Sequence, residues 1–269
     1  MDSKNPLTIP MAIVVAGGLI AGAIFLKGNA NLGPKAVQER PAVVAQPAET
    51  GAMPLRPIDA NRDHIRGNPN ANIVIVEFSD PECPFCERFH RTMQKVIETY
   101  GRSGSVAWVY REYPIPQLHS KAPKEAEAFE CAGELGGNAK FWEYADRLFA
   151  VTKSNDSLDP AMLPRIAVEV GLDEARFNEC LSSGRQQARI QEDRADGEGA
   201  GVDGTPHSVF VLKAAVSNKN KESLLTLMEP LRDPYGNLPI SFSLDGLRVG
   251  LNGALPLDII KQVIDTLLK

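Results

Sequence analysis

The sequence predicts an α/β fold with an inserted helical domain, and three observations support this prediction. First, residues 72–78 (NIVIVEF) and 105–113 (SVAWVYREY) are apolar runs rich in β-branched and aromatic residues, as strands are. Second, the segment between them carries apolar residues at helical spacing. A strand, a helix and a strand in this order imply a parallel pair joined by a crossover. Third, residues from about 120 to 199 hold only consecutive helical patterns, which indicates a helical insert.

The composition is that of a globular domain. The chain has 269 residues, of which 43% are hydrophobic and 23% are charged, so it is long enough for a sizeable core. Its formal net charge of -5 lacks the basic excess that a nucleic-acid-binding surface needs. We therefore expect no nucleic-acid partner.

The N-terminal part differs from the rest of the chain. Residues 9–26 form an uncharged, mostly apolar stretch of 18 residues, about the minimum for a transmembrane helix. A cleaved signal peptide is the alternative, although its apolar region is usually only about 7–15 residues long. We predict a membrane anchor at residues 1–27, which enters the membrane through residues 9–26. Residues 28–57 are rich in Ala, Pro, Gln and Val and are predicted to form a flexible, disordered linker.

The folded domain is predicted to span residues 58–269. Three elements are expected after the insert: a strand at residues 207–212 (HSVFVL), a hairpin around Asp245-Gly246 and a closing helix at residues 257–268. Residues 213–239 form a charged stretch before the hairpin, and a group of leucines within it predicts a short surface helix.

Residues 79–90 (SDPECPFCERFH) place two cysteines around a Pro-Phe pair, between a strand and a helix. Pro84 suits the first turn of a helix, so Cys83 is predicted at the helix N-terminus. Unpaired N–H groups and the helix dipole stabilise a thiolate there and lower its pKa. Cys86, one turn further on, is the expected resolving thiol. The motif therefore favours a working redox couple.

Two alternatives for this motif are a zinc site and an inert structural disulfide. A structural zinc site needs four ligands, usually from a second close pair of residues. Cys131 and Cys180 are isolated in the sequence, and the four histidines have no ligand-like spacing. A CxxC between a buried strand and a helix is the redox arrangement. We therefore expect no metal and no organic cofactor.

Three blocks of the sequence resemble one known family. They are DHIRGNPNANIVIVEFSDPECPFCERFH, GVDGTPHSVF and NGALPLDIIKQVID. Together they are similar to the DsbA-like, thioredoxin-fold family of extracytoplasmic thiol–disulfide oxidoreductases, over roughly residues 63–269. The resemblance implies a thioredoxin fold with an inserted helical domain. It also implies that Cys83 attacks, that Cys86 resolves, and that Thr205 and Pro206 form a cis-proline loop that binds substrate backbone; an ordinary trans-proline is the alternative.

Glu77 lies six residues before Cys83, on the predicted buried strand. The resemblance implies that this acid sits beneath the disulfide and helps to move the proton of Cys86. A carboxyl group in apolar surroundings has a raised pKa and can relay protons near neutrality. The alternative is an acid that reaches solvent at the strand end. Glu82 and His90 flank the motif, and neither is assigned a catalytic role.

Cys131 and Cys180 fall on two predicted helices of the insert. An even cysteine count in an exported chain favours a structural disulfide between them, which would stabilise by about 4 kcal/mol on the chain-entropy model. Two buried free thiols are the alternative. A bridge would place the domain on the oxidising, extracytoplasmic side of a prokaryotic cell membrane.

Two features depart from the family pattern. His207 follows the proline where a small or hydroxyl residue is usual, and would add a titratable group beside the site. The stretch at residues 213–239 lengthens the loop before the hairpin, so partner surfaces do not carry over from simpler family members.

We predict a membrane-anchored thiol–disulfide oxidoreductase that exchanges the Cys83–Cys86 disulfide with cysteines of exported proteins through a mixed disulfide, acting as a thiol oxidase. Its expected partners are those exported proteins and a membrane redox partner that recycles the couple. Isomerase and reductase roles stay open, because the sequence does not fix the reduction potential. A redox-inactive binding module that keeps the fold is the alternative from another class.

Overall fold

The computed structural model describes residues 53–269. The predicted anchor at residues 1–27, and most of the predicted linker at residues 28–57, lie outside the described residues. Within residues 53–269, no helix combines the length and the apolar character needed to cross a bilayer. Met53 is only 5% exposed, so the packed domain includes residues that precede the predicted start at Ile58.

Six strands form one mixed sheet in the order β1-β3-β2-β4-β6-β5. They are β1 (His64–Arg66), β2 (Ile73–Ser79), β3 (Val106–Glu112), β4 (His207–Leu212), β5 (Ile240–Phe242) and β6 (Arg248–Asn252). The β2 and β3 strands are parallel, as the crossover predicts, and the other neighbouring strands are antiparallel. Every residue of β2 and β3 is buried, which explains why their sequences read as continuous apolar runs.

The crossover between β2 and β3 consists of α2 (Pro84–Val96) and a π-helical turn, η1 (Ile97–Gly101). Its apolar face carries Phe89, Met93 and Val96, which are all buried against the sheet core. The helical spacing of the sequence therefore predicts the packed face correctly.

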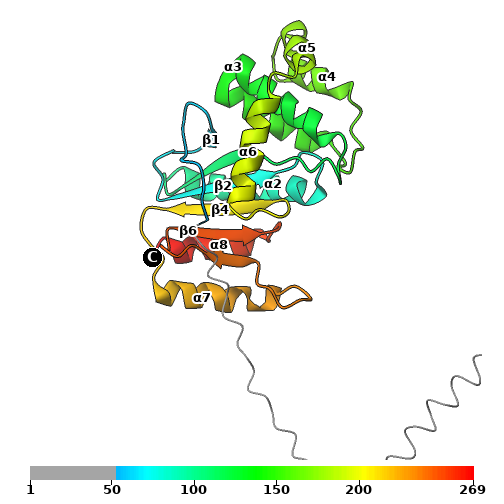
Figure 1. Ribbon diagram of the computed structural model, residues 1–269. Coiled ribbons are helices and arrows are strands. Elements are labelled where there is room, and N and C mark those ends of the chain that lie inside the picture. The colour runs from blue at the N-terminus through cyan, green and yellow to red at the C-terminus, as the bar shows by residue number, and fades with distance from the viewer. Residues whose placement is uncertain (1–52) are drawn as a thin grey trace, which may run out of the picture. The chain divides into compact units, whose positions relative to one another are not determined.

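The helical insert lies between β3 and β4 in sequence. In Figure 1 most of its helices lie together on one side of the sheet, and its last helix runs back along the sheet. The insert contains α3 (Ala122–Val151), α4 (Met162–Glu169), α5 (Glu174–Ser183) and α6 (Gln187–Gly199). Two of the predicted helical stretches join into α3, with a kink at Gly137, whose φ of 73° suits glycine. The insert thus begins and ends close to the predicted residues 120 and 199.

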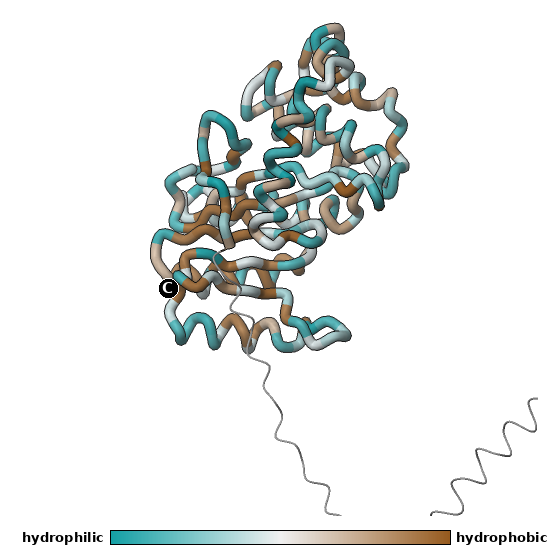
Figure 2. The backbone as a smooth tube through the Cα atoms, in the orientation of Figure 1, coloured by the Kyte–Doolittle hydropathy of each residue, from teal (hydrophilic) through white to brown (hydrophobic). Residues whose placement is uncertain are grey.

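Helices cover both faces of the sheet. One face packs against α2, α3 and α8 (Leu257–Leu267) and holds the larger apolar core. The other face packs against α6, which approaches very closely at Gly197: an added Cβ there would lie 2.8 Å from the Tyr113 ring. Figure 2 shows hydrophobic stretches gathered along the central strands, between these layers.

The C-terminal part follows the sequence prediction. Residues 213–239 contain the surface helix α7 (Asn218–Met228) and a short 3-10 turn, η2 (Glu229–Leu231). A hairpin joins β5 and β6 through a turn at Gly246, whose φ of 68° favours glycine. Helix α8 then closes the domain one residue earlier than predicted.

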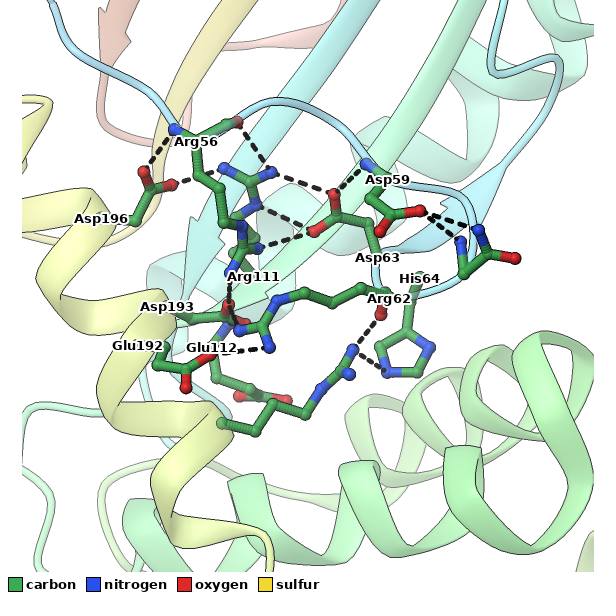
Figure 3. A network of polar contacts seen from close by, with 12 residues as sticks. Arg56, Asp59, Arg62, Asp63, His64, Arg111, Glu112, Glu192, Asp193 and Asp196 are labelled. Atoms are coloured by element: carbon green, nitrogen blue, oxygen red, sulfur yellow. Dashed lines mark hydrogen bonds and ion pairs between the residues drawn. The ribbon is translucent and has the colours of Figure 1, made fainter.

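A network of charged side chains fastens the N-terminal segment to β3 and α6 (Figure 3). The buried guanidinium of Arg111 donates to both carboxylate oxygens of Asp63, at 3.1 and 3.0 Å, and also pairs with Asp196. Arg56 pairs with Asp63 at 2.9 Å and with Asp193 at 3.1 Å. Because Arg56, Asp63, Arg111, Asp193 and Asp196 each have an oppositely charged partner, the cost of burying them is largely offset.

Candidate active site

Cys83 is the N-cap residue of α2, and Pro84 occupies the first helical turn, as predicted. No side chain caps the helix, so the N–H groups of its first turn face the Cys83 sulfur. Cys83 is 4% exposed and Cys86 is fully buried, and the two thiols are not bridged. Phe85, between them, is 54% exposed and stands at the surface beside the buried sulfurs.

The Thr205-Pro206 peptide bond is cis, and its loop lies against the cysteines. The Cys83 thiol donates to the carbonyl oxygen of Thr205 at 3.5 Å. The proline carbonyl in turn accepts a hydrogen bond from the Gly253 N–H at 3.0 Å, which ties the loop to the end of β6. Cys83 and Thr205 are 122 residues apart in sequence, nearly half of the chain, and meet at one end of the central strands.

The two thiols have opposite pKa shifts. The pKa of Cys83 falls to about 6, mainly because the Cys86 side chain donates a hydrogen bond to its thiolate. The backbone N–H groups of Cys86 and Phe85, together with a Thr205 side-chain hydrogen bond, lower it further. Burial and the neighbouring Cys83 charge raise the pKa of Cys86 well above its ordinary value. At neutral pH the pair therefore consists of one thiolate and one thiol.

Glu77 is fully buried on β2, on the same sheet face as the cysteines. Burial raises its pKa to about 8, and its charge is one of the causes that raise the pKa of Cys86. The alternative of a solvent-exposed acid at the strand end is therefore wrong. A buried carboxyl with a pKa near neutrality can both give and take a proton beside a thiol.

Trp108 is a site residue that the sequence analysis missed. Its indole N–H donates to the Glu77 carboxylate at 2.9 Å, whereas the other carboxylate oxygen of Glu77 has no partner within the described chain. In the β2–β3 register, Trp108 is paired with Ile75, which lies two residues before Glu77 on β2. Trp108 and Glu77 therefore share one face of the sheet. Side-chain alternation along the two strands gives part of the signal, but the register that brings Trp108 to Glu77 is not in the sequence.

Glu82, next to Cys83, is fully buried rather than solvated. Its carboxylate accepts from the Asp156 N–H at 2.6 Å, and its carbonyl accepts from the Asn155 N–H at 2.8 Å. Glu82 also lies beside Glu125, whose pKa rises to about 9 mainly through burial. It thus fastens the turn before Cys83 to a loop of the helical insert.

The two histidines that the sequence analysis singled out, His90 and His207, are buried. His90 contacts Asp146 through Nε2 at 2.7 Å, and burial lowers its pKa. His207 contacts Asn252 through Nδ1 at 2.8 Å, and burial lowers its pKa as well. Because strand side chains alternate, His207 shares the sheet face of Val209, opposite the cysteines. It does not add the titratable group beside the sulfurs that the sequence suggested.

Cys131 on α3 and Cys180 on α5 form a disulfide within the insert, 49 residues apart in sequence. Both are fully buried in the apolar core. Among residues 53–269, no three His, Cys, Asp or Glu side chains group in a way that could hold a metal ion.

Known proteins resemble this chain in sequence and in structure. The sodium–proton antiporter NhaA 3 of Salinispora tropica is 38% identical over 150 residues, which make up 56% of this chain and 22% of the antiporter. The chain thus spans about a fifth of the length of this curated relative.

Two solved structures share the fold. DsbA2 of Pseudomonas aeruginosa is 24% identical with a TM-score of 0.55, over 78% of this chain and 96% of that protein. Oxidised BdbD of Bacillus subtilis is 16% identical with a TM-score of 0.60, over 82% of this chain and 100% of that one. These likenesses establish a thioredoxin-like fold with a helical insertion.

A family model described as thioredoxin matches residues 59–229, which include the CxxC motif, the helical insert and the cis-proline loop. The chain therefore belongs to the thioredoxin family.

Proposed function

We propose that this protein is a thiol–disulfide oxidoreductase that works as a thiol oxidase on cysteines of exported polypeptides. The observation that carries the proposal is the split between the two thiols: the pKa of Cys83 is about 6, while burial raises the pKa of Cys86 well above its ordinary value. A structural dithiol has no need of such a split, whereas thiol–disulfide exchange depends on it.

The exchange begins with the oxidised Cys83–Cys86 disulfide. A substrate thiolate attacks the Cys83 sulfur, the Cys83–Cys86 bond breaks, and a mixed disulfide forms while Cys86 leaves as a thiolate. A second substrate thiolate then attacks the substrate sulfur of the mixed disulfide, and Cys83 leaves. The substrate loses two electrons and gains a disulfide, and the CxxC pair gains those electrons as a dithiol.

Glu77 supplies the proton movement in this scheme. The departing Cys86 thiolate is strongly basic in its buried site and takes a proton from the Glu77 carboxyl. In the reverse direction, the Glu77 carboxylate removes that proton before Cys86 can attack. Its pKa of about 8 keeps both forms accessible near neutral pH.

The oxidase direction rests on the stability of the Cys83 thiolate. A thiolate with a pKa of about 6 stabilises the reduced protein at neutral pH, so its disulfide is a better electron acceptor. The low pKa also makes Cys83 a good leaving group when the substrate disulfide forms.

The proposal extends to the location and the partners of the protein. The Cys131–Cys180 disulfide supports an extracytoplasmic position, because disulfides persist in oxidising compartments. Residues 9–26 would hold the domain at a prokaryotic cell membrane, and a membrane redox partner would reoxidise the dithiol. Sodium–proton exchange is not proposed, because the matched region is a small part of the antiporter.

The deciding experiment is the reduction potential of the Cys83–Cys86 couple, measured by equilibration with glutathione buffers. The C131S/C180S variant is the control, because it leaves a single redox couple. A potential near about −120 mV, as in DsbA, supports the oxidase. A potential near about −270 mV, as in thioredoxin, makes the protein a reductase, and one near about −180 mV makes it an isomerase. If glutathione never exchanges with the couple, the protein is not an oxidoreductase.

A further inference from the structure

A pocket of about 540 Å³ opens directly beside the cis-proline loop. Three segments line it: residues 203–206, residues 231–239 and the end of β6 at Asn252 and Gly253. The second segment belongs to the stretch at residues 213–239, to which the proposed function assigns no role. This stretch therefore builds one wall of a pocket at the candidate active site.

The wall is held in one conformation by its own hydrogen bonds. The carboxylate of Asp233 accepts from the N–H of Tyr235 at 2.9 Å and from the N–H and side-chain amide of Asn237 at 2.8 and 2.9 Å. Arg232 pairs with Glu229 at 2.7 Å, at the start of the same loop. Because these bonds close the loop on itself, the pocket is preformed and a ligand need not order it.

The lining combines apolar surface with negative charge. Leu231, Leu238 and Pro206 provide the apolar part, and among residues 53–269 only Asp203 and Asp233 are charged lining residues. The Asp233 carboxylate accepts hydrogen bonds within its own loop. Asp203 is exposed, and its carboxylate has no hydrogen-bond partner among residues 53–269. Within the described part of the chain, the lining thus presents one free anionic group and no cation.

The position of the pocket identifies what reaches it. The Thr205 carbonyl is 3.5 Å from the Cys83 sulfur, and Thr205 itself lines the pocket. A polypeptide joined to Cys83 by a mixed disulfide therefore starts at the pocket edge. An extended chain advances about 3.3 Å per residue, so residues two or three positions from the reacting cysteine fall over the lining.

We propose that this pocket is a subsite for the substrate polypeptide next to its reacting cysteine, and that Asp203 selects a lysine or arginine there. This inference rests on the proposed function. The aliphatic stem of such a side chain packs on Leu231 and Leu238 while its charge meets the carboxylate. Residues 231–239, which line the pocket, are then a specificity element of this chain.

The test uses the full oxidised chain and four thiol substrates. Three are otherwise identical cysteine peptides with Arg, Gln or Glu at the positions two residues before and after the cysteine, and the fourth is glutathione. The readout is the ratio of kcat/KM for the Arg peptide to kcat/KM for the Glu peptide. Because both kcat/KM values are measured on the same protein sample, a smaller fraction of folded or active enzyme lowers both equally and leaves their ratio unchanged.

The wild-type protein should prefer the Arg peptide over the Glu peptide, and D203N should lower that preference about threefold, as expected for an exposed ion pair. The matched control is E222Q, which removes one exposed carboxylate from α7 outside the pocket lining and should keep the preference. A preference that D203N leaves intact, or that E222Q lowers equally, overturns the subsite.

The fourth substrate separates the two proposals. If glutathione exchanges but the three peptides react equally, the subsite inference fails while the proposed function stands. If neither glutathione nor any peptide exchanges with the Cys83–Cys86 disulfide, the proposed function fails and the subsite falls with it.

Discussion

The two cysteine pairs of this chain are almost equally buried and yet chemically opposite. Cys86, Cys131 and Cys180 are fully buried, and Cys83 is 4% exposed. The insert pair is bridged across two helices, 49 residues apart, inside an apolar core. The CxxC pair lies at the start of one helix, against the cis-proline loop. Burial alone therefore does not decide whether a cysteine pair is inert. The hydrogen bonds to the Cys83 sulfur do, first that of the Cys86 side chain and then those of the backbone N–H groups.

The largest effect expected from this contrast is on exchange chemistry. The C83S variant should lose all measurable exchange with thiol substrates, because no other thiolate lies at the helix N-terminus. The C86S variant should still react through Cys83 with a small disulfide but should accumulate the mixed disulfide, which mass spectrometry detects. The C131S/C180S variant should exchange at nearly the wild-type rate. Exchange that depends on Cys131 or Cys180 would reverse the roles given to the two pairs.

The second effect concerns stability and should appear only for the insert pair. Opening the Cys131–Cys180 bridge frees a loop of 49 residues in the unfolded chain, which costs about 4 kcal/mol of stability on the chain-entropy model. Urea unfolding of C131S/C180S against wild type, with Cys83 and Cys86 reduced in both, measures this loss. An unchanged midpoint would mean that the bridge does not constrain the unfolded state.

The third effect is the pH dependence of Cys83 reactivity. Its pKa of about 6 means that the alkylation rate of the reduced protein should rise with a midpoint near pH 6, far below that of an ordinary thiol at about 8.5. The pKa of Cys83 is lower in the folded protein than in the unfolded chain. The thiolate therefore stabilises the reduced protein fully when the pH lies above the pKa of Cys83 in the unfolded chain. This stabilisation is lost as the pH falls through about 6. Iodoacetamide labelling of C86A and wild type tests this, and C86A should have a higher midpoint, since alanine cannot replace the Cys86 hydrogen bond that is the largest cause of the shift.

Most of the fold could be predicted from the sequence because its signals are local. The apolar runs of β2 and β3, the helical stripe of α2 and the Asp245-Gly246 turn each specify an element within a few residues. The strand β1 was missed because only three residues of it pair with β3, and a segment that short carries no period.

The missed parts of the site depend on contacts between distant segments. Glu82 reads as a surface acid in sequence, and only the backbone N–H groups of Asn155 and Asp156 explain its burial. No sequence motif predicts the pocket wall at residues 231–239, because its role depends on its position beside Thr205 in the fold. The contact from Trp108 to Glu77 needs the strand register, which the sequence alone does not supply.

The smallest predicted effect tests this contact with Glu77. The W108F variant keeps an aromatic ring but removes the indole N–H that donates to the Glu77 carboxylate. Losing a hydrogen bond to a charged group, worth about 1.5–3 kcal/mol, should raise the pKa of Glu77 from about 8 by roughly one to two units. The pH profile for resolution of a Cys83–glutathione mixed disulfide, followed by acid quench and mass spectrometry, should move toward alkaline pH by the same amount.

Trp142 offers a matched control for this substitution. It is also buried and packs against Trp108, with ring centroids 4.4 Å apart, but its indole N–H has no hydrogen-bond partner in the described chain. The W142F variant makes the same chemical change and disturbs the same core, so a purely structural effect should appear in both variants. A shift of the pH profile in W108F alone assigns the effect to the hydrogen bond. Equal shifts in the two variants, or none in either, would mean that Trp108 only fills the core and that burial by itself sets the pKa of Glu77.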